Sequence, residues 1–157
     1  MTFSGHISAA SWVLVATGNP YFAVPLCLAS HFVIDAIPHA EWQPWKRASF
    51  TVKILMVADS LATVLLVWLL YTRLPVNDWV VSAALLATLL PDLTDRFARK
   101  YVPAFRYIHE MMHTWPISPV GPIDWNATLT GKVSNLVKVL TQSGIVGLGF
   151  FLVFVYA

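Results

Sequence analysis

Three ionisable residues, spaced four apart, close an apolar segment of the chain: His31, Asp35 and His39. Residues four apart lie on the same face of an α-helix, so this spacing predicts one polar stripe. Such groups are costly in water-poor surroundings unless they pair, coordinate a metal or line a wet cavity. The stripe is therefore the first candidate for chemistry in this sequence.

A second group of histidines and acids is scattered through the rest of the chain. It comprises His6, Asp59, Asp92, Asp95, His109, Glu110 and His113. Imidazole and carboxylate ligands without a thiolate cluster suit a divalent metal, zinc above all, with manganese or iron as alternatives. Because these residues are too many for one ion, we expect two metals, or one metal together with a general base.

The composition indicates an integral membrane protein. Hydrophobic residues make up 57% of the 157 residues and charged residues only 11%, against about 25% charged in soluble proteins. The net charge of +2 is too small to indicate nucleic acid as a partner. The single Cys27 excludes an internal disulfide and metal sites built from several thiolates.

The elements that must position these residues are helices. The apolar runs predict an all-α bundle forming one membrane domain over residues 1–157, with four to five transmembrane or re-entrant helices and one interfacial helix. The first helix is short, so the first two helices either cross the bilayer or form a re-entrant pair. The expected helices cover residues 4–18, 20–37, 52–72, 78–95 and 132–156, with the interfacial helix at 102–115.

The basic residues predict an orientation. With the loop after Pro38 in the cytoplasm, nine of the ten Lys and Arg residues fall on or near the cytoplasmic side and only Arg73 lies opposite. The same topology brings all five histidines and five of the eight acids to the cytoplasmic end of the bundle. We therefore expect the polar site at that face of the membrane.

Simpler roles remain open for several of these residues. Asp59 could be a structural partner of Lys53 or of a serine. Asp92 and Asp95 could cap a helix end and pair with the arginines that follow them. His6 could be a terminal residue without a role.

A rival motif is His109-Glu110-Met-Met-His113. In zinc proteases, two histidines at this spacing bind the metal and the glutamate activates water. Asp92 or Asp95 could supply the third ligand. An intramembrane zinc protease is therefore an alternative function, but it leaves the stripe at His31 unexplained.

Four short motifs together resemble a known family. They are Gly5-His6, the run from Ser30 to His39, Leu90-Pro91-Asp92 and the late pair His109 and His113. With them the chain resembles small bacterial membrane proteins classed as membrane-bound metal-dependent hydrolases. More remotely, the stripe is similar to the core helix of zinc-dependent phospholipase C and related single-strand nucleases, which are all-helical and hydrolyse phosphodiesters with a zinc cluster. The resemblance implies that His31, Asp35, His39, Asp92, His113 and His6 are metal ligands.

The leading expectation is a metal-dependent hydrolase in the bacterial inner membrane, acting on phosphoester or lipid-phosphate substrates at the cytoplasmic face. Asp92 or Asp59 would complete the metal site, and Glu110 or Asp95 would act as general base. The non-enzymatic alternative is a metal-binding scaffold or a carrier. A carrier should place polar groups across the bilayer, but residues 61–70 and 80–89 are almost entirely apolar. The bilayer is the expected partner, and the oligomeric state is open.

Overall fold

The structure is a computed structural model that describes residues 3–35, 37, 40–41, 45–101, 107, 121–122 and 129–156. Within these ranges, side chains are described except at 40–41, 95–101, 121–122 and 129–136. The described part is all-α, as expected, apart from two strands of two residues each. Its helices are α1 (Phe3–Thr17), α2 (Pro20–Asp35), α3 (Phe50–Arg73), α4 (Asp78–Tyr101) and α6 (Leu129–Tyr156).

The two strands form a small parallel pair that the sequence did not predict. Strand β1 (Ala40–Glu41) pairs with β2 (Gly121–Pro122), with Ala40 opposite Gly121. Helix α4 also extends further than the expected 78–95. The interfacial helix expected at 102–115 falls almost entirely outside the described residues.

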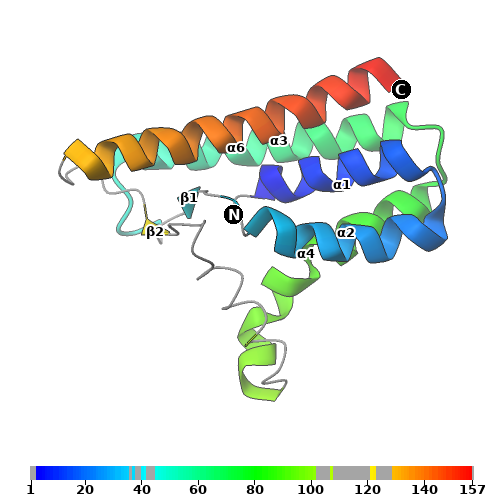
Figure 1. Ribbon diagram of the computed structural model, residues 1–157, viewed down its shortest axis with the longest axis horizontal. Coiled ribbons are helices and arrows are strands. Elements are labelled where there is room, and N and C mark those ends of the chain that lie inside the picture. Colours follow the sequence, from blue (N-terminus) through cyan, green and yellow to red (C-terminus); the bar gives the residue numbers. More distant parts are fainter. Residues whose placement is uncertain are drawn as a thin grey trace.

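A tight reversal joins α1 to α2. Gly18 has a φ of +57° and its N–H donates to the Leu14 carbonyl at 3.1 Å, which closes α1 with a left-handed residue that glycine adopts without strain. Asn19 then caps α2 by accepting from the N–H of Tyr21 at 3.0 Å, and Pro20 occupies the first helical position. The start of α1 therefore lies beside the end of α2 (Figure 1).

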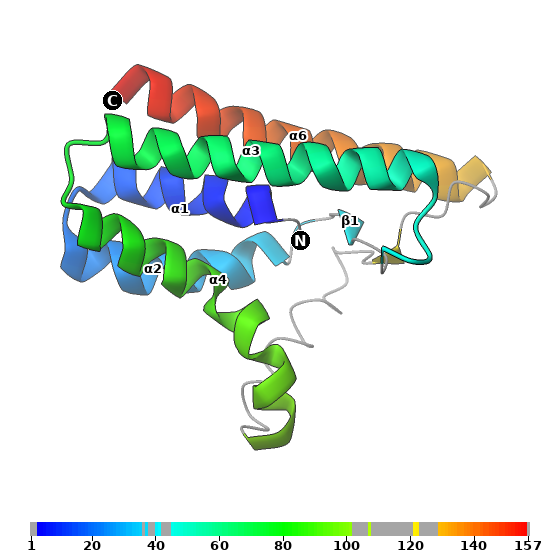
Figure 2. The same cartoon turned by 180° about the vertical axis from the view of Figure 1, so that it is seen from behind.

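Helix α1 is the centre of the bundle. It contacts every other helix of the described part, with α3 and α6 side by side along one side and α2 and α4 along the other (Figures 1 and 2). Its buried positions are mostly small residues, which allow this close approach on several sides. In the contact with α6 the two helices approach closely: a Cβ added at Gly149 would stand 2.6 Å from the Ser8 Cβ.

Helix α4 carries a proline in its middle. Pro91 has no N–H, so the carbonyl four residues before it loses its helical hydrogen bond, and helices bend at such positions. The second half of α4 turns away from the bundle (Figure 2). Asp92 directly follows this proline, at the point where α4 leaves the other helices.

Among the described residues, two helical segments are long and apolar enough to cross a membrane by length and composition: α3 and the segment Val137–Tyr156 of α6. Their outward side chains are large and apolar, for example Leu61, Trp68 and Phe151, which are more than half exposed. The interior holds an apolar core around Leu14, Leu66 and other residues, but also buried polar side chains.

Candidate metal centre

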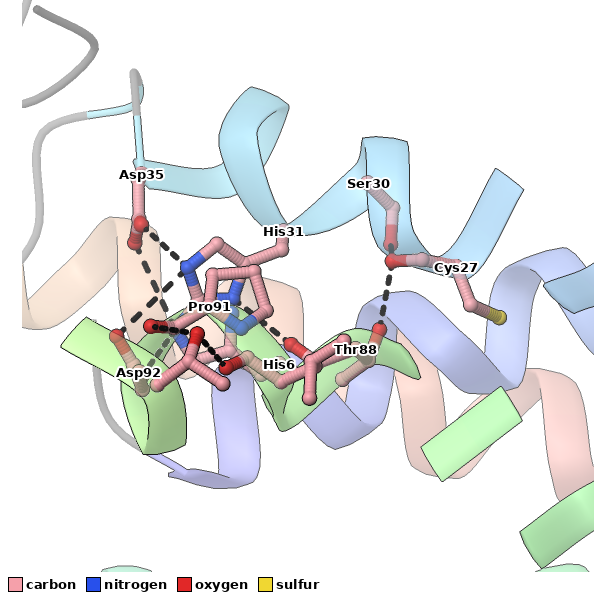
Figure 3. Close-up of polar contacts among 10 residues, drawn as sticks. His6, Cys27, Ser30, His31, Asp35, Thr88, Pro91 and Asp92 are labelled. Carbon is pink, nitrogen blue, oxygen red and sulfur yellow. Dashed lines mark hydrogen bonds and ion pairs between the residues drawn. The ribbon is translucent and has the colours of Figure 1, made fainter. Parts of the chain in front are cut away.

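Four ionisable side chains from three helices meet inside the bundle. His6 comes from α1, His31 and Asp35 from α2, and Asp92 from α4 (Figure 3). One potential ligand atom of each lies within 4.8 Å of those of the other three. The first three side chains are fully buried, whereas the Asp92 side chain is 30% exposed. This buried group could hold a metal ion.

The contacts within the group follow a regular pattern. The Nε2 atom of His6 lies 3.6 Å from Oδ1 of Asp35 and 3.5 Å from Oδ2 of Asp92. The Nε2 atom of His31 lies 2.9 Å from Oδ2 of Asp35 and 3.7 Å from Oδ1 of Asp92. Each carboxylate therefore presents one oxygen to each imidazole.

The two imidazole rings are stacked. The ring centroids of His6 and His31 are 4.2 Å apart and the ring planes differ by 10°. Both rings thus point their Nε2 atoms towards the same pair of carboxylates (Figure 3). This arrangement depends on the antiparallel packing of α1 and α2, which places His31 and Asp35, near the end of α2, beside His6, near the start of α1.

The hydrogen bond at the other ring nitrogen fixes the tautomer of His31. Its Nδ1 lies 2.8 Å from the carbonyl oxygen of Thr88. A carbonyl oxygen only accepts, so Nδ1 carries the hydrogen and a neutral His31 has its lone pair on Nε2. Metal-binding histidines commonly have this arrangement, with the second ring nitrogen held by a carbonyl or a carboxylate.

Thr88 is a residue of the site that the sequence reasoning missed. Besides accepting from His31, it donates its hydroxyl hydrogen to the Cys27 carbonyl at 2.8 Å. Two hydrogen bonds in opposite directions therefore join α2 to α4 beside the four ionisable groups (Figure 3). One signal could have indicated it: Thr88 stands four residues before Asp92, on the same face of an apolar helix.

Asp59 has a different setting from the one expected of a metal ligand. It is buried in α3, but it does not belong to the group of four that meets within 4.8 Å among the described residues. Its Oδ1 accepts a hydrogen bond from the Ser4 hydroxyl of α1. This matches the alternative in which Asp59 is the partner of a serine. Lys53, the other suggested partner, places its ammonium 5.5 Å from the centre of the Trp45 ring.

For several of the predicted site residues, the structure does not describe the side chain. His39, His109, Glu110 and His113 are not among the described residues, and the side chain of Asp95 is not described. The third member of the stripe, the rival protease motif and both proposed general bases therefore stay predictions. The structure brings together two residues of the stripe with His6 and Asp92.

Comparison with known proteins adds no relative. The chain matches no family model, no curated protein and no solved structure.

Proposed function

We propose that this chain is a membrane-embedded, metal-dependent hydrolase whose metal site is built from His6, His31, Asp35 and Asp92. The observation that carries the proposal is the pattern in which two carboxylates each present one oxygen to each of two stacked imidazoles. The expected substrates are phosphoesters or lipid phosphates at the cytoplasmic face of the membrane.

The charge of the group supports a cation. Two ionised carboxylates bring a charge of −2 into a buried site, where uncompensated charge is costly. Protonating both histidines would compensate it, but two imidazolium rings 4.2 Å apart would repel by about 4 kcal/mol at an effective dielectric constant of about 20. A divalent cation compensates the carboxylates and leaves both imidazoles neutral.

The group could hold two cations, because each carboxylate has one oxygen near each of the two imidazoles. Two-metal sites occur in phosphatases and nucleases. Imidazole and carboxylate donors favour zinc, with manganese or iron next. Bound metal would polarise a phosphoryl oxygen and make water acidic enough to attack near neutral pH.

The residues of the chain itself supply access and orientation. Asp92 is the partly exposed member of the group, so the site is open on the side of α4. Arg96 and Arg99 follow on the same helix, and guanidinium groups suit a phosphate through paired hydrogen bonds. Asp95 and Glu110 stay the proposed general bases.

The distribution of buried and exposed side chains supports the membrane setting. Large apolar residues cover the exposed faces of α3 and α6, while Ser8, Ser11 and Lys138 are buried. A protein in water places these classes the other way round. We therefore propose that the bundle is embedded in the bacterial inner membrane.

Elemental analysis of the purified protein tests the metal site. We expect about two ions per chain, lost in Asp35→Ala and retained in Asp78→Ala, an exposed acid at the start of α4. A chelator should destabilise the wild type, by about 2.7 kcal/mol when metal had been present at about 100 times its dissociation constant, and should not affect Asp35→Ala. Metal-free wild-type protein purified without chelators would refute the proposal.

Activity separates the hydrolase from its alternatives. The metal-loaded protein should release phosphate from a lipid phosphate such as phosphatidic acid, and Asp35→Ala should not. Bound metal without hydrolysis, together with lower stability of Asp35→Ala, would favour the scaffold. Loss of metal in His109→Ala but not in His31→Ala would favour the intramembrane protease.

A further inference from the structure

Three basic side chains gather at the turn that leads into α3. Lys46 and Arg47 are consecutive in this turn and exposed, and Lys53 lies in the first turn of the helix. The Nζ atom of Lys53 lies 5.5 Å from the centre of the Trp45 ring, which brings the ammonium group back to the turn. Within the described part of the chain, none of the three cations has a carboxylate at ion-pair distance. We call Trp45, Lys46, Arg47 and Lys53 the basic surface.

The length of α3 places the basic surface at a membrane boundary. Lys53 lies near the start of α3 and Arg73 at its end, 20 residues later. At 1.5 Å per residue this is about 30 Å, which equals the thickness of the hydrocarbon core of a bilayer, also about 30 Å. Trp45 is 52% exposed, and tryptophans are enriched at the level of lipid head groups. In the proposed membrane setting, the basic surface therefore lies level with the head groups.

An apolar face continues from Lys53 along the outside of α3. Val57 and Leu61 follow Lys53 at intervals of four residues, so all three lie on one face of the helix. Val57 is 49% exposed and Leu61 is 65% exposed. A phospholipid has the same order of groups, with a charged head at the interface and apolar chains beneath it. A soluble phosphate would use only the basic end of this face.

We propose that the basic surface binds the phosphate group of an anionic phospholipid, whose acyl chains lie along Val57 and Leu61. Three positive charges without an acidic partner favour a lipid with a net negative charge over a zwitterionic lipid. Arginine binds phosphate through paired hydrogen bonds, and lysine binds it as a point charge. The proposal rests on the membrane setting given under the proposed function, and not on the metal or on hydrolysis.

The opposite end of the bundle has a different charge. Within the described residues, Arg73 is the one basic residue at that end, which is formed by residues 14–24, 68–82 and 150–156 (Figures 1 and 2). The same end contains the acid Asp78, so its formal charge is zero. Arg73 is therefore a matched control for Lys53, because both are basic and lie near an end of α3, but Arg73 has no second cation beside it.

Native mass spectrometry tests the binding. The protein in detergent micelles is titrated with dioleoyl phosphatidylglycerol, with dioleoyl phosphatidylcholine and with inorganic phosphate, and the bound species are counted by mass. We expect phosphatidylglycerol to bind about tenfold more tightly than phosphatidylcholine, and inorganic phosphate not to displace it. Equal binding of the two lipids would overturn the proposal. Displacement by inorganic phosphate would overturn it too, because the surface would then be a site for soluble phosphate.

Lys53→Gln and Arg73→Gln each remove one positive charge from an end of α3. A basic residue at an anionic membrane surface contributes about fivefold in affinity, the equivalent of about 1 kcal/mol. We therefore expect Lys53→Gln to weaken the binding of phosphatidylglycerol about fivefold and Arg73→Gln to leave it unchanged. Equal weakening in the two variants would show that binding follows net charge rather than the basic surface, which contradicts the proposal.

A double variant keeps the net charge and moves one cation. Thr51 is exposed in the first turn of α3, and residues two apart point to nearly opposite sides of a helix. In Thr51→Lys combined with Lys53→Gln, the ammonium group therefore leaves the Trp45 ring. We expect binding as weak as in Lys53→Gln, and recovery of wild-type binding would overturn the proposed site. Metal content measured on the same samples should equal that of the wild type, because Lys53 lies outside the group of four, so lipid binding and metal binding can fail separately.

Discussion

Thr88 uses both of its polar groups across the contact between α2 and α4. Its carbonyl accepts from Nδ1 of His31, and its hydroxyl donates to the carbonyl of Cys27. The first bond fixes which nitrogen of His31 faces the carboxylates, and the second fixes where Thr88 itself lies. Thr88 is therefore a positioning residue for the candidate metal centre.

Thr88→Val removes only the hydroxyl bond and keeps the size of the side chain. We expect the unfolding free energy to fall by about 1 kcal/mol, and the affinity for metal to fall about tenfold because the support of His31 is loosened. Chelator competition measures the affinity and thermal unfolding the stability. Thr94→Val is the control, because the Thr94 hydroxyl bonds to the carbonyl of Leu90 in its own helix. Equal metal affinity in both variants would remove Thr88 from the site.

Some residues of the candidate metal centre could be predicted from the sequence and others could not. His31 and Asp35 follow from their spacing, since four residues make one turn of helix. The approach of His6 and Asp92 followed from the antiparallel topology and from the family resemblance. Thr88 shares a helix face with Asp92 by the same spacing, but its bonding partners and that of Ser4 could not be found this way, because a hydroxyl in an apolar run takes its partner from whichever helix packs beside it.

At the scale of elements, α1 decides whether the site forms. It is too short to cross a bilayer alone, yet it contacts every other described helix. Its contact with α6 is closest where Ser8 meets Gly149. At Gly144 and Gly147, by contrast, an added Cβ would meet no atom within 4 Å.

Gly149→Ala tests this close contact. The new Cβ would stand 2.9 Å from the Cα of Ser8, a backbone atom, so one of the two helices must move. We expect a loss of about 1–3 kcal/mol in the unfolding free energy, and less bound metal because His6 moves with α1. Unfolding in mixed detergent micelles and metal analysis measure the two effects. Gly144→Ala should change neither, and a Gly149→Ala protein with full stability and full metal would show that α1 is held by other contacts.

The helices were largely predictable from the lengths of the apolar runs and from their stop signals. Gly18-Asn19-Pro20 ends one helix and starts the next, and Ser49 caps α3 by accepting from the N–H of Val52. The helix expected at 78–95 already ran through Pro91, but the continuation of α4 to Tyr101 was not predicted. The pairing of Ala40 with Gly121 depends on a partner 81 residues away, for which the local sequence holds no signal.

At the scale of the whole molecule, the arrangement of polar and apolar side chains argues for a lipid environment. The long outer helices expose apolar residues, and the polar groups of α1, α2 and α4 face inward. The distribution of lysine and arginine predicts which end faces the cytoplasm. The structure does not bear on this orientation, so it stays a prediction.

Cysteine labelling tests the orientation. Asn77→Cys lies in the turn before α4 and Thr51→Cys in the first turn of α3, at opposite ends of α3, and both positions are exposed. In intact bacterial cells, a membrane-impermeant maleimide should label Asn77→Cys, and should label Thr51→Cys only after permeabilisation. The native Cys27 is buried and serves as the background. The reverse labelling pattern would place the metal centre on the outer face.

The candidate metal centre takes its residues from α1, α2 and α4, and α3 lies between α2 and α4 in the chain. This order has a consequence for biosynthesis. Fifty-seven positions separate Asp35 from Asp92, and a ribosome adding about 5–20 residues per second needs roughly 3 to 11 s to cover them. During this interval the nascent hairpin of α1 and α2 presents His6, His31 and Asp35 without their fourth partner. Completion of the site therefore waits for α4 to arrive, so that in a protein that binds metal there, as proposed, full loading would be a late step in the maturation of the chain.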